Sequence, residues 1–91
     1  MEYRINISSE AERDIQKALC YYKMSNLESA FSSDFINQIE YLKSNPFLFQ
    51  LYYKKVRRIH FSKFNYSIHY FVEEDVVYIL RILHVKQYTG V

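Results

Sequence analysis

Pro46, the only proline in this chain of 91 residues, separates two segments whose apolar residues follow different periods. Before it, apolar side chains recur every three or four residues, which is the spacing of amphipathic helices. After it, β-branched and aromatic residues dominate, which is typical of strands. Because helical geometry is disfavoured for a residue that precedes proline, the last helix has to end by Asn45. We therefore expect helices first and most of a sheet afterwards.

One short strand and two helices are expected before Pro46. Tyr3, Ile5 and Ile7 alternate with polar residues and predict the strand. The apolar stripes of the two helices comprise Ala11, Ile15, Ala18, Leu19 and Tyr22, and then Leu27, Phe31, Phe35, Ile39 and Leu42. Each stripe follows a serine and a glutamate at the spacing of a capping box, Ser9 with Glu12 and Ser25 with Glu28. The short break at 25–26 makes the two helices an antiparallel hairpin.

Three strands are expected after Pro46, at 54–61, 66–72 and 76–83. The breaks between them, 62–65 and 73–75, are short enough for hairpin turns. Residues 47–53 form an apolar connector without a clear period, expected to lie against the core. The predicted fold is α+β with the order β-α-α-β-β-β, in which the helical hairpin covers one face of an antiparallel sheet. The last three strands form a meander, and the first strand returns to pair with them.

The chain, 11.1 kDa in mass, is expected to form a single domain over residues 1–91. It contains ten tyrosines and seven phenylalanines, which is more than so small a core can hold. An aromatic sheet face that no helix covers indicates a protein partner. The residues expected on that face are His69, Phe71 and some of Tyr66, Tyr70 and Tyr78.

The net charge is only +2, which does not indicate a strongly basic nucleic-acid binder. The cations nevertheless form two groups at strand ends, Lys54, Lys55, Arg57 and Arg58 in one and Arg81, His84 and Lys86 in the other. In an antiparallel sheet these ends can lie side by side and bind phosphate, with Tyr88 available to stack on a base. The alternative is a charged rim that keeps the sheet edge from pairing with other chains.

No metal site or cofactor is expected. His60, His69 and His84 could converge from adjacent strands, but His60 and His84 have no nearby carboxylate to orient them, so surface or interface histidines are the simpler interpretation. Cys20, the only cysteine, excludes a disulfide framework, is expected to be buried and inert, and suits a reducing compartment. No apolar run is long enough for a membrane span and no signal peptide is recognisable, so a cytoplasmic location is expected.

The order and spacing of several short strings resemble a known family. They are Tyr3-Arg4-Ile5-Asn6-Ile7-Ser8 with Ala11 and Asp14, then Ala30, Phe35 and Asn45-Pro46, then Val56-Arg57-Arg58-Ile59, Phe64-Asn65-Tyr66-Ser67-Ile68-His69-Tyr70 and Val77-Tyr78-Ile79-Leu80 up to His84. Together they resemble the RelE/ParE superfamily of toxins from type II toxin–antitoxin systems. The resemblance covers nearly the whole chain and implies the same helical hairpin on a sheet.

The resemblance also implies partners. Members of this superfamily are held inactive by a cognate antitoxin, usually encoded beside them, in a toxin–antitoxin hetero-oligomer. RelE-like members resemble ribosome-dependent mRNA endonucleases, whereas ParE-like members inhibit DNA gyrase and have no known hydrolytic centre. Ser67 stands where RelE-type nucleases carry an arginine, and loss of that arginine favours the ParE-like function.

Three functions follow from this resemblance. The first is a growth-inhibiting, plasmid-stabilising toxin that binds gyrase and is not an enzyme, with Lys54, Lys55, Arg57 and Arg58 as target-binding residues and Tyr66, His69, Phe71 and Tyr78 as antitoxin-binding residues. The second is an endoribonuclease whose catalytic residues would be Arg57, Arg58, Arg81, His84, Lys86 and Tyr88. The third is a binding protein of the same family that has lost its toxicity.

Overall fold

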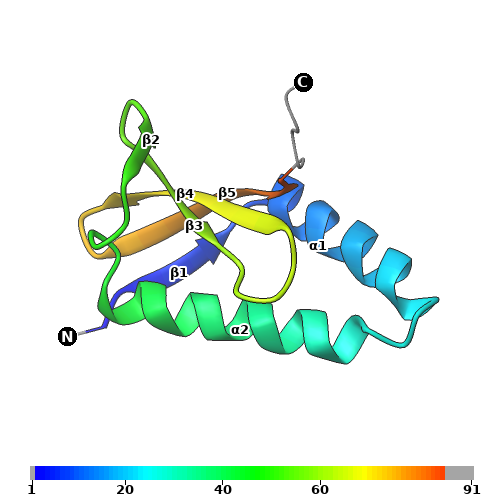
Figure 1. Cartoon of the computed structure of the whole chain (residues 1–91). Coiled ribbons are helices and arrows are strands. Elements are labelled where there is room, and N and C mark those ends of the chain that lie inside the picture. Colours follow the sequence, from blue (N-terminus) through cyan, green and yellow to red (C-terminus); the bar gives the residue numbers. More distant parts are fainter. Residues whose placement is uncertain (1, 86–91) are drawn as a thin grey trace, which may run out of the picture.

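The computed structural model describes residues 2–85 as a five-stranded sheet with two helices packed on one face (Figure 1). The elements are, in chain order, β1 (Arg4–Ile7), α1 (Ser9–Lys23), α2 (Glu28–Ser44), β2 (Leu51–Tyr53), β3 (Val56–His60), β4 (Tyr66–Glu73) and β5 (Val76–His84). The α+β class, the helical hairpin and the meander β3-β4-β5 confirm the prediction. In the described part of the chain, neither helix combines the length and apolarity that crossing a bilayer requires.

The pairing of β1 differs from the prediction. The strand order is β1-β5-β4-β3-β2, and β1 runs parallel to β5, with Arg4 opposite Val76. α2 returns the chain to the end of the sheet where β1 starts, and there Tyr3 N donates a hydrogen bond to Lys43 O (2.9 Å). β3 therefore leaves in the direction of β1, β4 reverses, and β5 runs in the direction of β1 again. The prediction of a wholly antiparallel sheet is wrong for this pair.

A fifth strand, β2, lies within the connector that was expected to pack against the core. Its residues are exposed at the outer edge of the sheet, with Leu51 opposite Arg57 and Tyr53 opposite Val56. Within 47–53, Phe49 is half-buried against the core, whereas the three residues of β2 are exposed, so the expectation is wrong for β2. A three-residue strand is too short to give the sequence a detectable alternation.

The helix starts also differ from the predicted capping boxes. Ser8, one residue earlier than expected, caps α1: its Oγ accepts a hydrogen bond from Ala11 N (3.0 Å) and donates one to Leu80 O (2.8 Å). α2 begins after Leu27 without a side-chain cap. Cys20 is exposed on α1, contrary to the expectation of a buried thiol.

The core between helices and sheet is centred on Phe31 of α2, whose side chain is completely buried. Its ring centroid lies between 5.0 and 5.3 Å from those of Tyr22, Phe61, Phe64 and Tyr66. Such stacked and edge-to-face pairs add to the stabilisation that burial alone supplies. Tyr22 was expected in the apolar stripe of the first helix, and Tyr66 was a candidate for the uncovered face but packs against Phe31 instead.

A bulge in the β4–β5 ladder determines which side chains of β5 face the helices. The register shifts between His69 and Tyr70, because Leu80 has no partner on β4. Val77, Ile79 and Ile82 are all buried, although the last two are three residues apart. The extra residue allows the chain to keep both apolar residues in the core, and it places Arg81 beside His69.

The loop between β3 and β4 is fixed by Asp34, a carboxylate of α2 that is only 3% exposed. It accepts hydrogen bonds from Ser62 N (3.0 Å), Lys63 N (2.7 Å) and Gln38 Nε2 (3.0 Å). Burial by itself raises the pKa of a carboxyl group, but these hydrogen bonds outweigh it and hold the pKa of Asp34 below its ordinary value. Asp34 is therefore ionised at neutral pH and ties the loop to α2.

Candidate functional site

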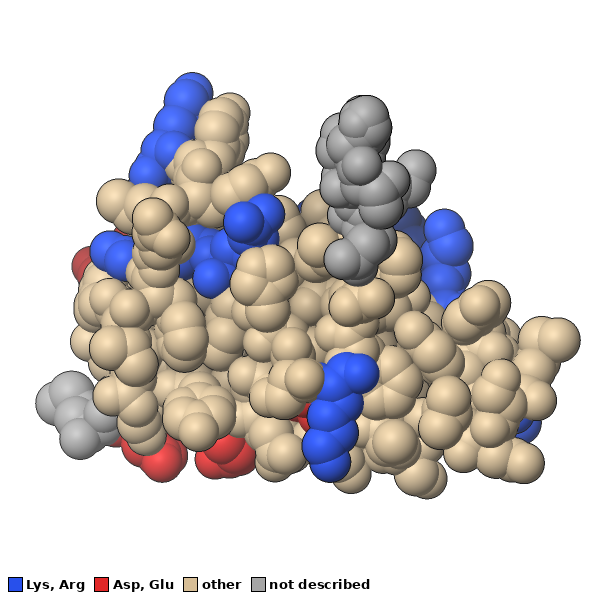
Figure 2. Space-filling view, in the orientation of Figure 1, with Lys and Arg blue, Asp and Glu red and all other residues tan. Residues whose placement is uncertain are grey.

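The sheet face that the helices leave uncovered carries cations and aromatic rings from β3, β4 and β5. Arg58 is opposite His69, and His69 is opposite Arg81, so the three form a row across the sheet. The adjacent pair Phe71 and Tyr78 stacks, with ring centroids 5.0 Å apart. We call these five residues the open face. Figure 2 shows Lys and Arg atoms gathered over the β2–β3 hairpin, on the side away from α2.

β2 adds a ring to this row. The guanidinium carbon of Arg58 lies 4.1 Å from the ring centroid of Tyr52, and the Tyr52 ring meets the His69 ring edge-on at 5.2 Å. A cation–π contact of this kind contributes about 0.5–1 kcal/mol at an exposed site. Tyr52 therefore helps to hold Arg58 over the open face. The sequence did not predict this residue, because it lies in the connector without a period.

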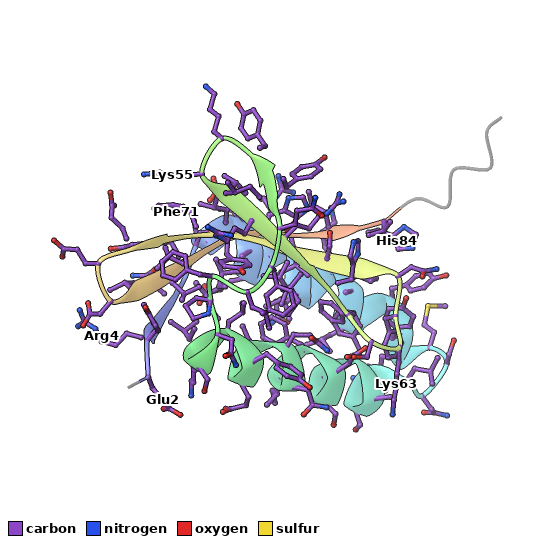
Figure 3. The ribbon with its side chains drawn as sticks, turned by 60° about the vertical axis from the view of Figure 1, so that its left-hand side comes forward. Glu2, Arg4, Lys55, Lys63, Phe71 and His84 are labelled. Carbon is purple, nitrogen blue, oxygen red and sulfur yellow. The ribbon has the colours of Figure 1, made fainter. Side chains whose placement is uncertain are left out.

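The predicted target-binding lysines lie at the tip of the β2–β3 hairpin. Lys55 Nζ is 4.6 Å from the ring centroid of Phe71, and Figure 3 shows the two residues on the same side of the sheet. Lys55 also pairs with Glu73 at 3.6 Å. Lys54 is exposed with a positive φ of 49°, and its Nζ is 5.5 Å from the ring centroid of Tyr53. Both lysines thus border the open face.

His69 contacts a buried hydroxyl group. Its Nε2 is 3.1 Å from Oγ of Ser67, whose residue is 1% exposed, and either atom can be the donor. Burial lowers the pKa of His69, and the positive charges of Arg58, His60 and Arg81 lower it further. His69 is therefore neutral at pH 7.

Arg81 is bound by α1. Its Nε and Nη2 donate to the two carboxylate oxygens of Asp14 at 2.7 and 3.0 Å, and Ile82 N donates to the same carboxylate at 2.9 Å. Burial raises the pKa of a carboxyl group, but the bonds from Arg81 and Ile82 and the charge of Arg81 hold the pKa of Asp14 below its ordinary value. Asp14 takes the place of a strand neighbour here, because β1 pairs with β5 only as far as Ile79.

Arg57 points to the opposite side of the sheet from Arg58. It is opposite the buried Tyr70, its Nη1 donates to the carbonyl oxygen of Phe49 at 2.6 Å, and its guanidinium lies 5.2 Å from the Phe47 ring centroid. Tyr70 donates from its hydroxyl group to Pro46 O at 2.7 Å, and burial raises the pKa of Tyr70 to about 12. These two side chains anchor the connector between α2 and β2.

Replacing Arg57 with alanine is therefore expected to lower the free energy of unfolding by about 1–2 kcal/mol, because it removes a hydrogen bond and the packing on Phe47. Arg58→Ala is the matched control and is expected to cost less than about 1 kcal/mol. Urea unfolding followed by circular dichroism measures both. Equal losses in the two variants would contradict the assignment of the neighbouring arginines to opposite faces.

Two further predicted residues, Tyr66 and His84, are not on the open face. Tyr66 faces the helices within the aromatic core, because it shares its strand face with Ile68 and Tyr70. His84 is opposite Tyr66, with the two rings edge-to-face at 5.1 Å. Lys86 and Tyr88 lie outside the described residues. Of the two cation groups, the structure therefore brings together Arg58 and Arg81, with His69 between them.

The pair Ser67–His69 has the geometry of a nucleophile and a base, but its environment does not suit catalysis. The hydroxyl group of Ser67 is buried, so a substrate cannot reach it. The charged groups that shift the pKa of His69 are cations, and none is a carboxylate that would orient and charge the ring. Within residues 2–85, no group of three or more metal-ligating side chains was found. The open face is suited to binding.

Exposed apolar residues gather on the connector and on β2, at one edge of the sheet. Leu48 is 71% exposed and Tyr53 is 59% exposed. The other large apolar residues of this stretch that are more than half exposed are Phe47, Leu51 and Tyr52. A run of this kind on a small domain typically marks a surface that contacts another protein. The prediction that some of the aromatic rings are left exposed is confirmed here.

The helical hairpin, the mixed sheet and the uncovered cationic face define a domain of the RelE/ParE class. The family model described as ParE toxin of type II toxin–antitoxin system, parDE, matches residues 5–88. The chain belongs to the ParE toxin family. Among solved structures, a chain of the chromosomal ParDE toxin–antitoxin system from P. aeruginosa has the same fold, with a TM-score of 0.80 over 93% of this chain and 98% of that one, at 16% identity. No curated protein matches the chain.

Proposed function

We propose that this protein is a growth-inhibiting toxin of the cytoplasm that binds and inhibits DNA gyrase and is neutralised by a cognate antitoxin. The observation that carries the proposal is the match of residues 5–88 to the ParE toxin family. The open face adds a surface for macromolecular contact, since arginine and aromatic residues are enriched at protein interfaces. A complex with the antitoxin, encoded beside the toxin, fits a role in plasmid stabilisation.

Several contacts favour binding over cleavage of RNA. Arg81 is bound in a two-bond ion pair to Asp14, and Arg57 is engaged with the connector on the helix side. Ser67 is buried at the position where the RelE-type nucleases carry an arginine. A nuclease needs such side chains free to stabilise the charge that develops on the phosphate in the transition state.

The exposed apolar residues of the connector and β2 favour a protein partner of considerable size. An antitoxin segment that covers them together with the open face is expected to bury about 1,500–3,000 Å² in total. His69, Phe71 and Tyr78 remain the proposed antitoxin contacts. Tyr66 packs in the core between the helices and the sheet, so we propose a structural role for it.

The test is expression of the chain alone from an inducible promoter, together with a supercoiling assay on purified gyrase. We expect growth arrest, DNA-damage signalling and intact mRNA, and rescue by the neighbouring open reading frame. Cleaved mRNA with active gyrase would instead support the endoribonuclease. Unimpaired growth would support a family member that only binds.

Arg58→Ala is expected to weaken gyrase inhibition about tenfold or more, which corresponds to about 1.4 kcal/mol of binding free energy. The reason is that Arg58 is the arginine of the open face that no carboxylate of residues 2–85 engages. Arg4→Ala, an exposed cation on β1 that pairs with Asp75, is the matched control and is expected to inhibit like the wild type. Inhibition by Arg58→Ala at the wild-type concentration would exclude the open face from target binding.

A further inference from the structure

The row across the open face contains two arginines, of which one forms an ion pair with a carboxylate and the other does not. Arg81 is held by the carboxylate of Asp14 through two hydrogen bonds. Arg58, at the other end of the row, stacks on Tyr52 and is absent from the ion pairs formed within residues 2–85. In the strand register, His69 on β4 is opposite Arg58 on β3 and opposite Arg81 on β5.

We propose that Arg58 and His69 together bind the carboxylate of an acidic side chain from a protein partner, and that His69 takes up a proton as the carboxylate binds. The proposal rests on the proposed function, in which the open face contacts a partner protein, and it specifies the chemistry of that contact. The Arg81–Asp14 pair is an internal example of the same recognition, a planar guanidinium holding both carboxylate oxygens.

An acidic protein segment fits this face better than a nucleic acid does. Nucleic-acid affinity depends on several cations that neutralise phosphates. Among the described residues of this face, Lys55 is paired with Glu73 and Arg81 with Asp14, which leaves few unpaired cations there for a phosphate backbone. Arg58 instead stacks on Tyr52 and shares a surface hollow with Leu48 and Phe49, and aromatic residues and arginine are enriched at protein interfaces.

Proton uptake follows from what surrounds His69. The charged and polar groups that face it are Arg58 and His60 on β3, Arg81 on β5 with its partner Asp14 on α1, Tyr52 on β2 and Ser67 on β4. Burial and the positive charges keep the pKa of His69 low in the free protein. A carboxylate bound beside Arg58 offsets this repulsion and favours the imidazolium form.

Ser67 allows both protonation states of His69. A hydroxyl group can donate to the neutral ring nitrogen or accept from the protonated one, so Nε2 keeps its hydrogen bond after proton uptake. In the imidazolium form both ring nitrogens carry a hydrogen, so Nδ1 can donate to the incoming carboxylate while Nε2 donates to Ser67. By linkage, binding strengthens as the pH falls, by at most about tenfold per pH unit for one proton.

The experiment is an NMR titration of the His69 ring nitrogens in the full chain, at low ionic strength, with two probes of equal charge. The probes are a short polyglutamate peptide and an oligothymidylate. We expect polyglutamate to raise the pKa of His69 and to bind more tightly at about pH 6 than at about pH 8. His69→Gln is expected to abolish the pH dependence of peptide binding.

Matched variants complete the test. In Arg58→Gln, the pKa of His69 in the free protein is expected to rise, because one repelling charge is gone, and the response to polyglutamate is expected to disappear. Arg4 lies on β1, the edge strand at the opposite end of the sheet from β2, and Arg4→Gln is expected to behave like the wild type. A response to oligothymidylate alone, no response to either probe, or an unchanged pKa of His69 in Arg58→Gln would each overturn the proposal. The titration needs neither toxicity nor an antitoxin. Its outcome therefore tests this proposal separately from the proposed inhibition of gyrase.

Discussion

Phe31→Ala is expected to lower the free energy of unfolding by about 3–5 kcal/mol, a large part of the stability of a domain this small. The substitution removes a fully buried ring that four other rings surround, and the cavity it leaves cannot close without moving both α2 and the β3–β4 loop. Thermal and urea unfolding, followed by circular dichroism, measure the loss.

Ile36→Ala is the matched control on the same helix, since Ile36 is exposed. It is expected to cost less than about 1 kcal/mol. If both variants lost the same stability, α2 would not bury the face that contains Phe31. Phe31→Leu, which keeps most of the volume, is expected to fold and to lose less than Phe31→Ala.

Asp34→Ala is expected to cost about 3–5 kcal/mol, because it leaves the amide groups of Ser62 and Lys63 and the side chain of Gln38 without their acceptor. Asp34→Asn keeps one acceptor oxygen and is expected to lose less. Asp75→Ala, which breaks only an exposed pair with Arg4, is the control and is expected to cost less than about 1 kcal/mol.

The same residue gives a pH dependence whose sign is fixed. Because the pKa of Asp34 is lower in the folded protein than in the unfolded chain, its stabilisation is complete above the ordinary value of 3.8 and is lost as the pH falls through the folded value. The wild type is therefore expected to lose stability below about pH 4 more steeply than Asp34→Asn. Parallel acid transitions in the two proteins would show that Asp34 does not carry this effect.

Most of the fold could be predicted because its signals are local. Pro46 ends α2, and the turns at 62–65 and 73–75 set the meander. The parallel pairing of β1 could not be predicted, since it places Arg4 opposite Val76 and depends on the end of the sheet at which α2 ends. The predicted cap of α1 was wrong by one residue, because Ala11 N donates to the hydroxyl group of Ser8 and not to that of Ser9.

The site was predicted in composition but not in arrangement. Alternation along a strand separates Arg57 from Arg58, yet only the observed register shows which of them faces the helices. The bulge at Leu80 determines where Arg81 lies, and no pattern in the sequence marks it. The ion pair between Arg81 and Asp14 joins residues 67 positions apart, which no local spacing reveals.

The pairing of the first strand with the last has a consequence for synthesis. A nascent chain that ends before β5 lacks both ladders that β5 forms, so β1 stays without a partner strand until β5 has been synthesised. Contacts this distant in sequence also slow folding. The five-stranded sheet can therefore be completed only after the segment that contains β5 has been made.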